Sequence, residues 1–130
     1  MNIRNLTLTL LFLTLISCSK KSRDELDREI LTTTKWLEVR TEADSSTRRY
    51  IYVFGSSGQL AIYILESDTD GRLDKTCRYI FNSDRELLAI ESMGPFNVQE
   101  ISTDILRLKP EGSTLPAMQL KRYSKPVSLN

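Results

Sequence analysis

The segment RYIYVFGSSGQLAIYIL, residues 49–65, contains the pattern that decides the fold. Two runs rich in aromatic and β-branched residues, 49–54 and 59–65, flank the sequence Gly-Ser-Ser-Gly at 55–58. Aromatic and β-branched residues favour strands, and glycine adopts the backbone angles that tight turns need. The segment therefore predicts an antiparallel hairpin. Alternate residues of its first strand share a face, but both faces are apolar enough to be buried.

Short strands separated by turn residues continue on both sides of this hairpin. We expect eight strands, at residues 35–40, 49–54, 59–65, 76–81, 86–91, 96–101, 105–109 and 115–123. Nearly all the connections have hairpin length. A meander of eight strands can close into an antiparallel up-and-down barrel, which leaves no free edge and can enclose one small ligand. The sequence thus predicts an all-β barrel, with an open sandwich of the same strands as the competing architecture.

A short helix is expected just before the first strand. Ser22 and Glu25 have the spacing of a capping box, in which each side chain satisfies a free amide at the start of a helix. Leu26 and Ile30 would share one helical face with the next leucine, and the threonines at 32–34 end the pattern. We expect a two-turn helix within a barrel domain of residues 23–123, followed by a frayed tail at 124–130.

Residues 1–17 are typical of a bacterial lipoprotein signal peptide. One cationic residue, Arg4, precedes an apolar run at 6–16, which is shorter than the ~20 residues that span a bilayer as a helix. The run ends in Leu-Ile-Ser-Cys at 15–18, which looks like the lipobox that precedes a lipidated cysteine. Cys18 would then carry fatty acyl chains such as palmitate, and residues 18–22 would form a tether between the membrane and the barrel. The alternative is an ordinary secretory or uncleaved segment with an incidental cysteine.

The residue after the expected anchor bears on location. It is Ser19 rather than aspartate, which in many Gram-negative bacteria favours transfer to the outer membrane. Acidic residues first occur at Asp24 and Glu25, whereas some surface-export signals place them directly after the cysteine. We expect a cell-envelope protein held in the outer membrane by its amino-terminal lipid and facing the periplasm.

Four short motifs follow one another along the predicted barrel region. Trp36 lies in Lys-Trp-Leu-Glu-Val at 35–39, and Phe-Gly-Ser-Ser-Gly-Gln-Leu follows at 54–60. Phe-Asn-Val at 96–98 then precedes Ile-Ser-Thr-Asp-Ile-Leu-Arg-Leu at 101–108. Over residues 31–123 the chain resembles the small lipocalin-like lipoproteins of Gram-negative bacteria, although Thr34 replaces the glycine that true lipocalins have two residues before the tryptophan. The resemblance implies a lipocalin-like barrel in the cell envelope, and it implies no catalytic residues.

The composition disfavours several classes of function. The chain has 18 basic and 17 acidic residues, and loss of Arg4 with the signal peptide would balance them, so no broad positive field is available for nucleic acid. Histidine, the commonest general base, is absent, and no Gly-x-Ser-x-Gly elbow occurs. Cys77 has no histidine to activate it and is expected to be a buried apolar residue. We predict a protein that is not an enzyme.

No cofactor or metal site is expected. The sequence Asp-Thr-Asp-Gly at 68–71, with Asp74 beyond it, is similar to the start of a calcium loop. A complete EF-hand loop needs a bidentate glutamate at its twelfth position, and Tyr79 occupies that position. Because aspartate and glycine are also common in hairpin turns, we interpret this stretch as a turn.

The aromatic residues are the remaining candidates for a binding site, because ligand pockets are mostly apolar and aromatic. The proposed ligand-binding residues are Trp36, Tyr52, Phe54, Tyr63, Tyr79 and Phe96. These side chains would instead fill the core if the barrel is solid, and Trp36 and Phe54 are the strongest candidates to point inward. Two hypotheses follow: a carrier of a small apolar ligand, or a filled barrel that docks on another envelope protein. The oligomeric state is not predicted.

Overall fold

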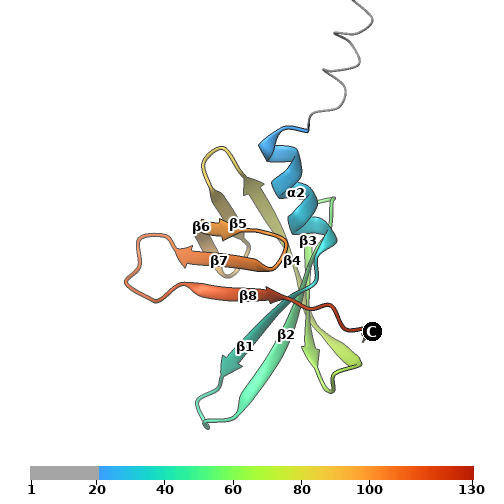
Figure 1. Ribbon diagram of the computed structural model, residues 1–130. Coiled ribbons are helices and arrows are strands. Elements are labelled where there is room, and N and C mark those ends of the chain that lie inside the picture. The colour runs from blue at the N-terminus through green and yellow to red at the C-terminus, as the bar shows by residue number, and fades with distance from the viewer. Residues whose placement is uncertain (1–20) are drawn as a thin grey trace, which may run out of the picture.

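The computed structural model describes residues 21–130, so the predictions of a signal peptide and of a lipidated Cys18 lie outside the described residues. Within this part a single helix precedes a series of strands (Figure 1). The elements are α2 (Arg23–Thr33), β1 (Trp36–Thr41), β2 (Thr47–Phe54), β3 (Gln59–Leu65), β4 (Asp70–Asn82), β5 (Leu87–Ile90), β6 (Gly94–Ile101), β7 (Ile105–Pro110), β8 (Met118–Arg122) and β9 (Ser128–Leu129). No helix in residues 21–130 has the length and apolar character needed to span a bilayer.

Strands β1 to β8 form a closed antiparallel barrel. Each strand pairs with the next one along the chain, and β1 pairs with β8, so the order around the barrel is the order in the sequence. The prediction of an all-β, eight-stranded up-and-down barrel preceded by a short helix is therefore confirmed, and the open sandwich is excluded. This architecture is consistent with the lipocalin-like fold that the resemblance implies.

The wall of the barrel is fully closed only in the half next to α2. In the described chain β1 pairs with β8 through Trp36 and Leu37, while β4 pairs with β5 from Tyr79 to Asn82. Beyond these contacts the barrel splays into two four-stranded sheets, β1–β4 and β5–β8 (Figure 1). The end of the barrel opposite α2 is called the splayed end below.

Strand β4 begins at Asp70, earlier than the predicted 76–81. Most of the side chains between Asp70 and Thr76 are exposed, so this half of the strand lacks the apolar alternation on which the prediction depended. It is extended because its backbone pairs with β3, with a register shift at Ile62 and Tyr63. Pairing with a neighbouring strand, rather than side-chain burial, determines its conformation.

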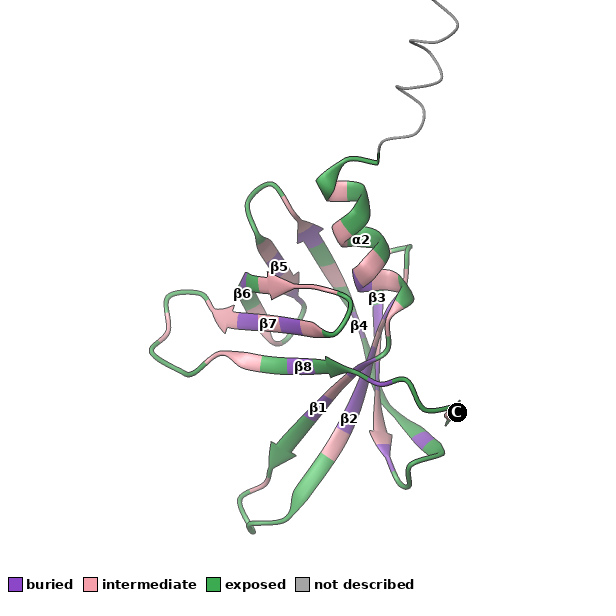
Figure 2. Ribbon diagram, viewed as in Figure 1, coloured by how far each residue is buried: buried purple, intermediate pink, exposed green. Residues whose placement is uncertain are grey.

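Buried residues alternate with more exposed ones along several strands (Figure 2). The buried side chains form two clusters, one inside and one outside the barrel. Trp36 and Phe54 are fully buried in the inner cluster, as predicted. Ile51 lies on the other face of β2 in the outer cluster, packed with Leu65 and Tyr123. Both faces of β2 are thus buried, which explains why its two sets of alternating residues are both apolar.

Helix α2 is fixed against the closed half of the barrel. The Ser22 side chain accepts a hydrogen bond from the backbone N–H of Glu25 at 3.2 Å, which is the expected N-cap contact. Arg28 donates to the backbone oxygen of Phe81 at 2.6 Å, and Asp24 accepts from Ser83 in the β4–β5 turn. The helix runs to Thr33, longer than the predicted two turns, because Thr33 and its neighbour bond back to carbonyl groups one turn earlier instead of ending it.

The prediction of a frayed tail at 124–130 is wrong. Strand β9 pairs in parallel with the start of β4, and the Asn130 oxygen accepts from the N–H of Leu73 at 2.7 Å. Val127 and Leu129 pack on the outer cluster. Asp68 in the β3–β4 loop anchors this segment through Lys125, at 3.5 Å. The tail is held because it covers apolar side chains that the outer face of β2 and β3 would otherwise expose to water.

A substitution at Gly71 tests the packing of Leu129 against the start of β4. A Cβ atom at Gly71 would lie 2.7 Å from Cδ2 of Leu129, so Gly71→Ala forces the Leu129 side chain to shift and loosens its packing on β4. We expect faster hydrogen exchange at the Leu73 amide and a loss of unfolding free energy of up to about 1 kcal/mol. In a Leu129→Ala background the same change should be neutral or stabilising, since alanine lowers the entropy of the unfolded chain. If Gly71→Ala changes the free energy of unfolding equally with Leu129 and with Ala at position 129, the contact between these two residues is contradicted.

Candidate functional site at the splayed end

The inner face of β1 and β2 carries a cluster of polar side chains where the barrel splays. Glu38 is only 7% exposed, although it is charged. Its carboxylate accepts from Tyr52 Oη at 2.9 Å and from Arg40 Nη2 at 2.6 Å. Arg40 Nη2 also donates to Tyr52 Oη at 3.1 Å, so these three groups form a closed triangle of hydrogen bonds.

Two further residues extend this cluster toward solvent. The Arg40 guanidinium lies over the ring of Tyr50, with Cζ 4.3 Å from the ring centroid, which is a cation–π contact. Tyr50 Oη donates to Glu42 at 3.1 Å. We call Glu38, Arg40, Glu42, Tyr50 and Tyr52 the polar cluster. The alternation of β1 and the register Glu38↔Tyr50 and Trp36↔Tyr52 bring these side chains to one face.

Burial and the ion pair set the electrostatics of this cluster. Burial raises the pKa of the Tyr52 hydroxyl, and the neighbouring Glu38 carboxylate raises it further, so Tyr52 stays protonated and donates. Burial by itself would lower the pKa of Arg40, but the hydrogen bond and negative charge of Glu38 outweigh it and the pKa is raised. The cluster therefore holds a permanent cation at Arg40 beside a neutral phenol at Tyr52.

The polar cluster is internally satisfied. Within residues 21–130 every buried side-chain nitrogen and oxygen has a hydrogen-bond partner. Glu38 accepts the hydrogen bonds from Tyr52 and Arg40 through one carboxylate oxygen, Oε1. The same part of the chain contains no group of three or more Cys, Asp or Glu side chains arranged to hold a metal ion. The hydrogen bonds of the polar cluster join β1 to β2 in the region where β1 no longer pairs with β8.

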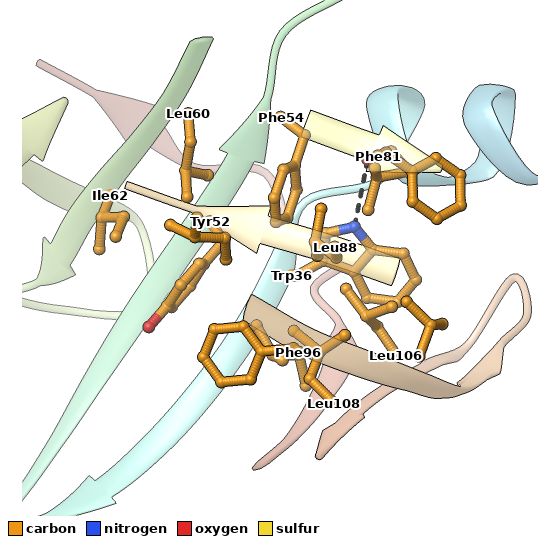
Figure 3. Close-up of a cluster of buried hydrophobic side chains, with 14 of the residues drawn as sticks. Trp36, Tyr52, Phe54, Leu60, Ile62, Phe81, Leu88, Phe96, Leu106 and Leu108 are labelled. Atoms are coloured by element: carbon orange, nitrogen blue, oxygen red, sulfur yellow. Dashed lines mark hydrogen bonds between the residues drawn. The ribbon is translucent and has the colours of Figure 1, made fainter. Parts of the chain in front are cut away.

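Five of the six proposed ligand-binding residues lie together inside the barrel. Trp36, Tyr52 and Phe54 are fully buried, and Phe96 is 5% exposed (Figure 3). Tyr79 is half-buried against them, with its ring edge-on to Phe54 at a centroid distance of 5.0 Å. The Trp36 indole N–H donates to the backbone oxygen of Leu31 at 3.2 Å. These side chains are therefore packed on one another.

Tyr63 lies apart from the other five. It belongs to the outer cluster, on the face of β3 that the C-terminal segment covers. Cys77 is buried on the inner side of β4, and burial raises the pKa of its thiol, which keeps it protonated and unreactive. Contact of the six aromatic residues with a ligand stays a prediction.

The rest of the interior is occupied by aliphatic side chains. Those of the inner cluster that are at 0% exposure, together with Trp36, Tyr52 and Phe54, are Leu60, Leu88, Leu106, Leu108 and Leu120. They come from strands all around the barrel, and Figure 3 shows Leu88, Leu106 and Leu108 directed at the Trp36 ring. An eight-stranded barrel is just wide enough for side chains to fill it. The closed half of this barrel is filled in that way.

Sequence reasoning missed the polar cluster, although its signal was available. Trp36, expected to point inward, shares a face of β1 with Glu38 and Arg40 because strand side chains alternate. Tyr50 and Tyr52 share the corresponding face of β2. Combining the two alternations would have placed a carboxylate, a guanidinium and two phenols together inside the barrel.

The chain was compared with known proteins at the level of families, sequences and folds. No protein-family model, no curated protein and no solved structure matches it.

Proposed function

We propose that this protein is a non-enzymatic, lipid-anchored module of the cell envelope that binds another envelope protein through its outer surface. The observation that carries the proposal is the filled interior: eight inner side chains, from six of the eight barrel strands, are at 0% exposure. The other two strands contribute Phe81 on β4, at 4%, and Phe96 on β6, at 5%. A filled barrel is a rigid scaffold, and what it presents to other molecules is its surface.

A carrier of a small apolar ligand is the competing function. A ligand inside the closed half would have to displace side chains such as Trp36 or Leu106, which are packed without solvent contact. Displacing well-packed side chains is costly because interiors are packed as densely as organic crystals. The carrier function is therefore the less favoured of the two hypotheses.

The membrane attachment in this proposal comes from the sequence at 15–18, with Cys18 as the lipidated residue and the periplasmic side of the outer membrane as the location. Helix α2 begins at Arg23, a few residues after Cys18, and contacts the β4–β5 turn through Asp24. A tether this short keeps the α2 end of the barrel near the bilayer. The splayed end with its polar cluster would then face away from the membrane.

Native mass spectrometry of the chain from Ser19, purified gently from its own host, tests the filled barrel. All elements from α2 to β9 lie within this chain. We expect the bare mass alone, both as purified and after mixing with excess palmitate, and we expect Trp36 fluorescence to resist solvent quenchers. A reproducible extra mass that is lost on denaturation would overturn the proposal in favour of a carrier.

A further inference from the structure

The outer faces of β4, β5 and β6 form an exposed apolar patch next to two opposite charges. Ile80 on β4 is 71% exposed, the highest value among the large hydrophobic residues of the described chain. Its cross-strand neighbour is Ala89, and Ala89 in turn pairs with Pro95. These side chains line a cleft of about 380 Å³, and Arg78 and Glu91 lie at one end of it. We call Arg78, Ile80, Ala89, Glu91 and Pro95 the β4–β5 patch.

The β4–β5 patch is complementary to itself in shape. Ile80 protrudes, whereas Ala89 beside it has the smallest side chain of the patch and forms the floor of the cleft between Ile80 and Pro95. A protruding isoleucine from a second molecule fits the hollow over Ala89. Exposed apolar patches that combine in this way mark interaction sites.

The patch is also complementary to itself in charge. Arg78 on β4 is adjacent to Glu91, the residue directly after β5, and the N–H of Glu91 donates to the Arg78 oxygen at 2.9 Å. Neither side chain makes an ion pair within 4.0 Å among residues 21–130. Both charges are therefore available to a partner that carries the same two residues.

We propose that the β4–β5 patch binds the same patch of a second copy of this chain, about a two-fold axis that runs parallel to β4 and β5. Such an axis lays β4 of one copy over β5 of the other. Ile80 then lies over Ala89 of the second copy, and Arg78 lies opposite Glu91 of the second copy. Each contact occurs twice, as two-fold symmetry requires.

The orientation of this axis agrees with anchoring in one membrane. Rotation about an axis parallel to the strands keeps their direction, so both copies have α2 and the β4–β5 turn at the same end. A two-fold axis across the strands would instead lay β4 over β4 of the second copy, so that Arg78 would not face Glu91, and would direct the two α2 helices to opposite ends. This step rests on the proposed function, because it uses the lipid anchor, whereas the complementarity of the patch does not.

The contact is small, since two convex barrel walls touch over few strands. Interfaces well below ~800 Å² per partner are weak, so we expect a dissociation constant between about 100 µM and 1 mM in solution. Anchoring both copies in one bilayer raises their effective concentration, which makes a weak contact sufficient.

Sedimentation equilibrium of the chain from Ser19, up to ~1 mM, tests the proposal. We expect a monomer–dimer equilibrium that Ile80→Asp weakens at least tenfold, because it places a charge in an apolar contact. Arg78→Glu should weaken it through repulsion from Glu91, and the double variant Arg78→Glu/Glu91→Arg should restore it. The matched control is Lys121→Glu, the same charge reversal on β8, four strands away around the barrel.

Two outcomes would overturn this proposal. One is a chain that stays monomeric at every concentration, and the other is a dimer that Ile80→Asp leaves intact. Neither result affects binding of a different envelope protein, so the proposed function survives them. That function fails on a different observation, a ligand retained inside the barrel.

Discussion

Replacing Trp36 by alanine is expected to lower the free energy of unfolding by about 3–5 kcal/mol. Trp36 is fully buried at the start of β1, where it fills the closed half of the barrel. Its truncation removes apolar contact area and leaves a cavity, and it also frees the Leu31 oxygen that the indole N–H binds. A domain of this size is stable by only about 5–15 kcal/mol, so this single change removes a large part of the total.

Urea denaturation followed by far-UV circular dichroism measures this loss, since Trp36 is the only tryptophan and its fluorescence disappears with it. The matched controls are Trp36→Phe, which keeps most of the ring volume, and Val39→Ala on the same strand, where the side chain is 61% exposed. We expect about 1–2 kcal/mol for Trp36→Phe and under about 0.5 kcal/mol for Val39→Ala. Added indole should restore part of the stability of Trp36→Ala by occupying the cavity. A loss below about 1 kcal/mol for Trp36→Ala would contradict the filled interior.

The second large effect is expected for Glu38→Ala, at about 2–3 kcal/mol. Removing the carboxylate leaves the buried Tyr52 hydroxyl without its acceptor and leaves Arg40 without its counter-charge. Breaking a fully buried ion pair costs more, but the Arg40 side chain is 43% exposed, so water compensates part of the loss.

Three further variants identify the cause of this loss. Tyr52→Phe should cost about 1 kcal/mol, because Glu38 keeps Arg40 as its partner. Glu38→Ala combined with Tyr52→Phe should lose less than the sum of these two single changes, as expected for residues in one network. Glu100→Ala removes a strand glutamate that pairs with Arg107 at 2.8 Å on the surface, and should cost under about 1 kcal/mol. If Glu38→Ala costs no more than Glu100→Ala, the polar cluster does not stabilise the barrel.

Much of the fold follows from local patterns. The hairpin of β2 and β3 has its strands and its turn within one or two residues of the expected positions, because aromatic and β-branched residues and glycine act locally. The helix start at Ser22 is equally local, since an N-cap needs only nearby amides. The order of the strands followed from hairpin-length connections, which make consecutive strands neighbours, whereas closure needs β1 to pair with β8, far along the chain.

Other features depend on contacts between residues distant in the sequence. The outer cluster exists because Tyr123 and the segment after it return to cover Ile51 and Leu65, and nothing local in 124–130 indicates a binding partner. The first half of β4 is a strand because β3 pairs with it. The predicted strand bounds failed where pairing, rather than side-chain alternation, determined the conformation.

The sequence by itself determined the strands, their turns, their order around the barrel and the start of the helix, because these depend on residues within a few positions of one another. The inward direction of Trp36 and Phe54 was also predictable. Only the tertiary structure decided which face is inside for most other strands, how Glu38 bonds to Tyr52 and Arg40, and that Ile80 remains exposed. Alternation defines two faces of a strand, but which face is buried depends on what the rest of the chain packs against it.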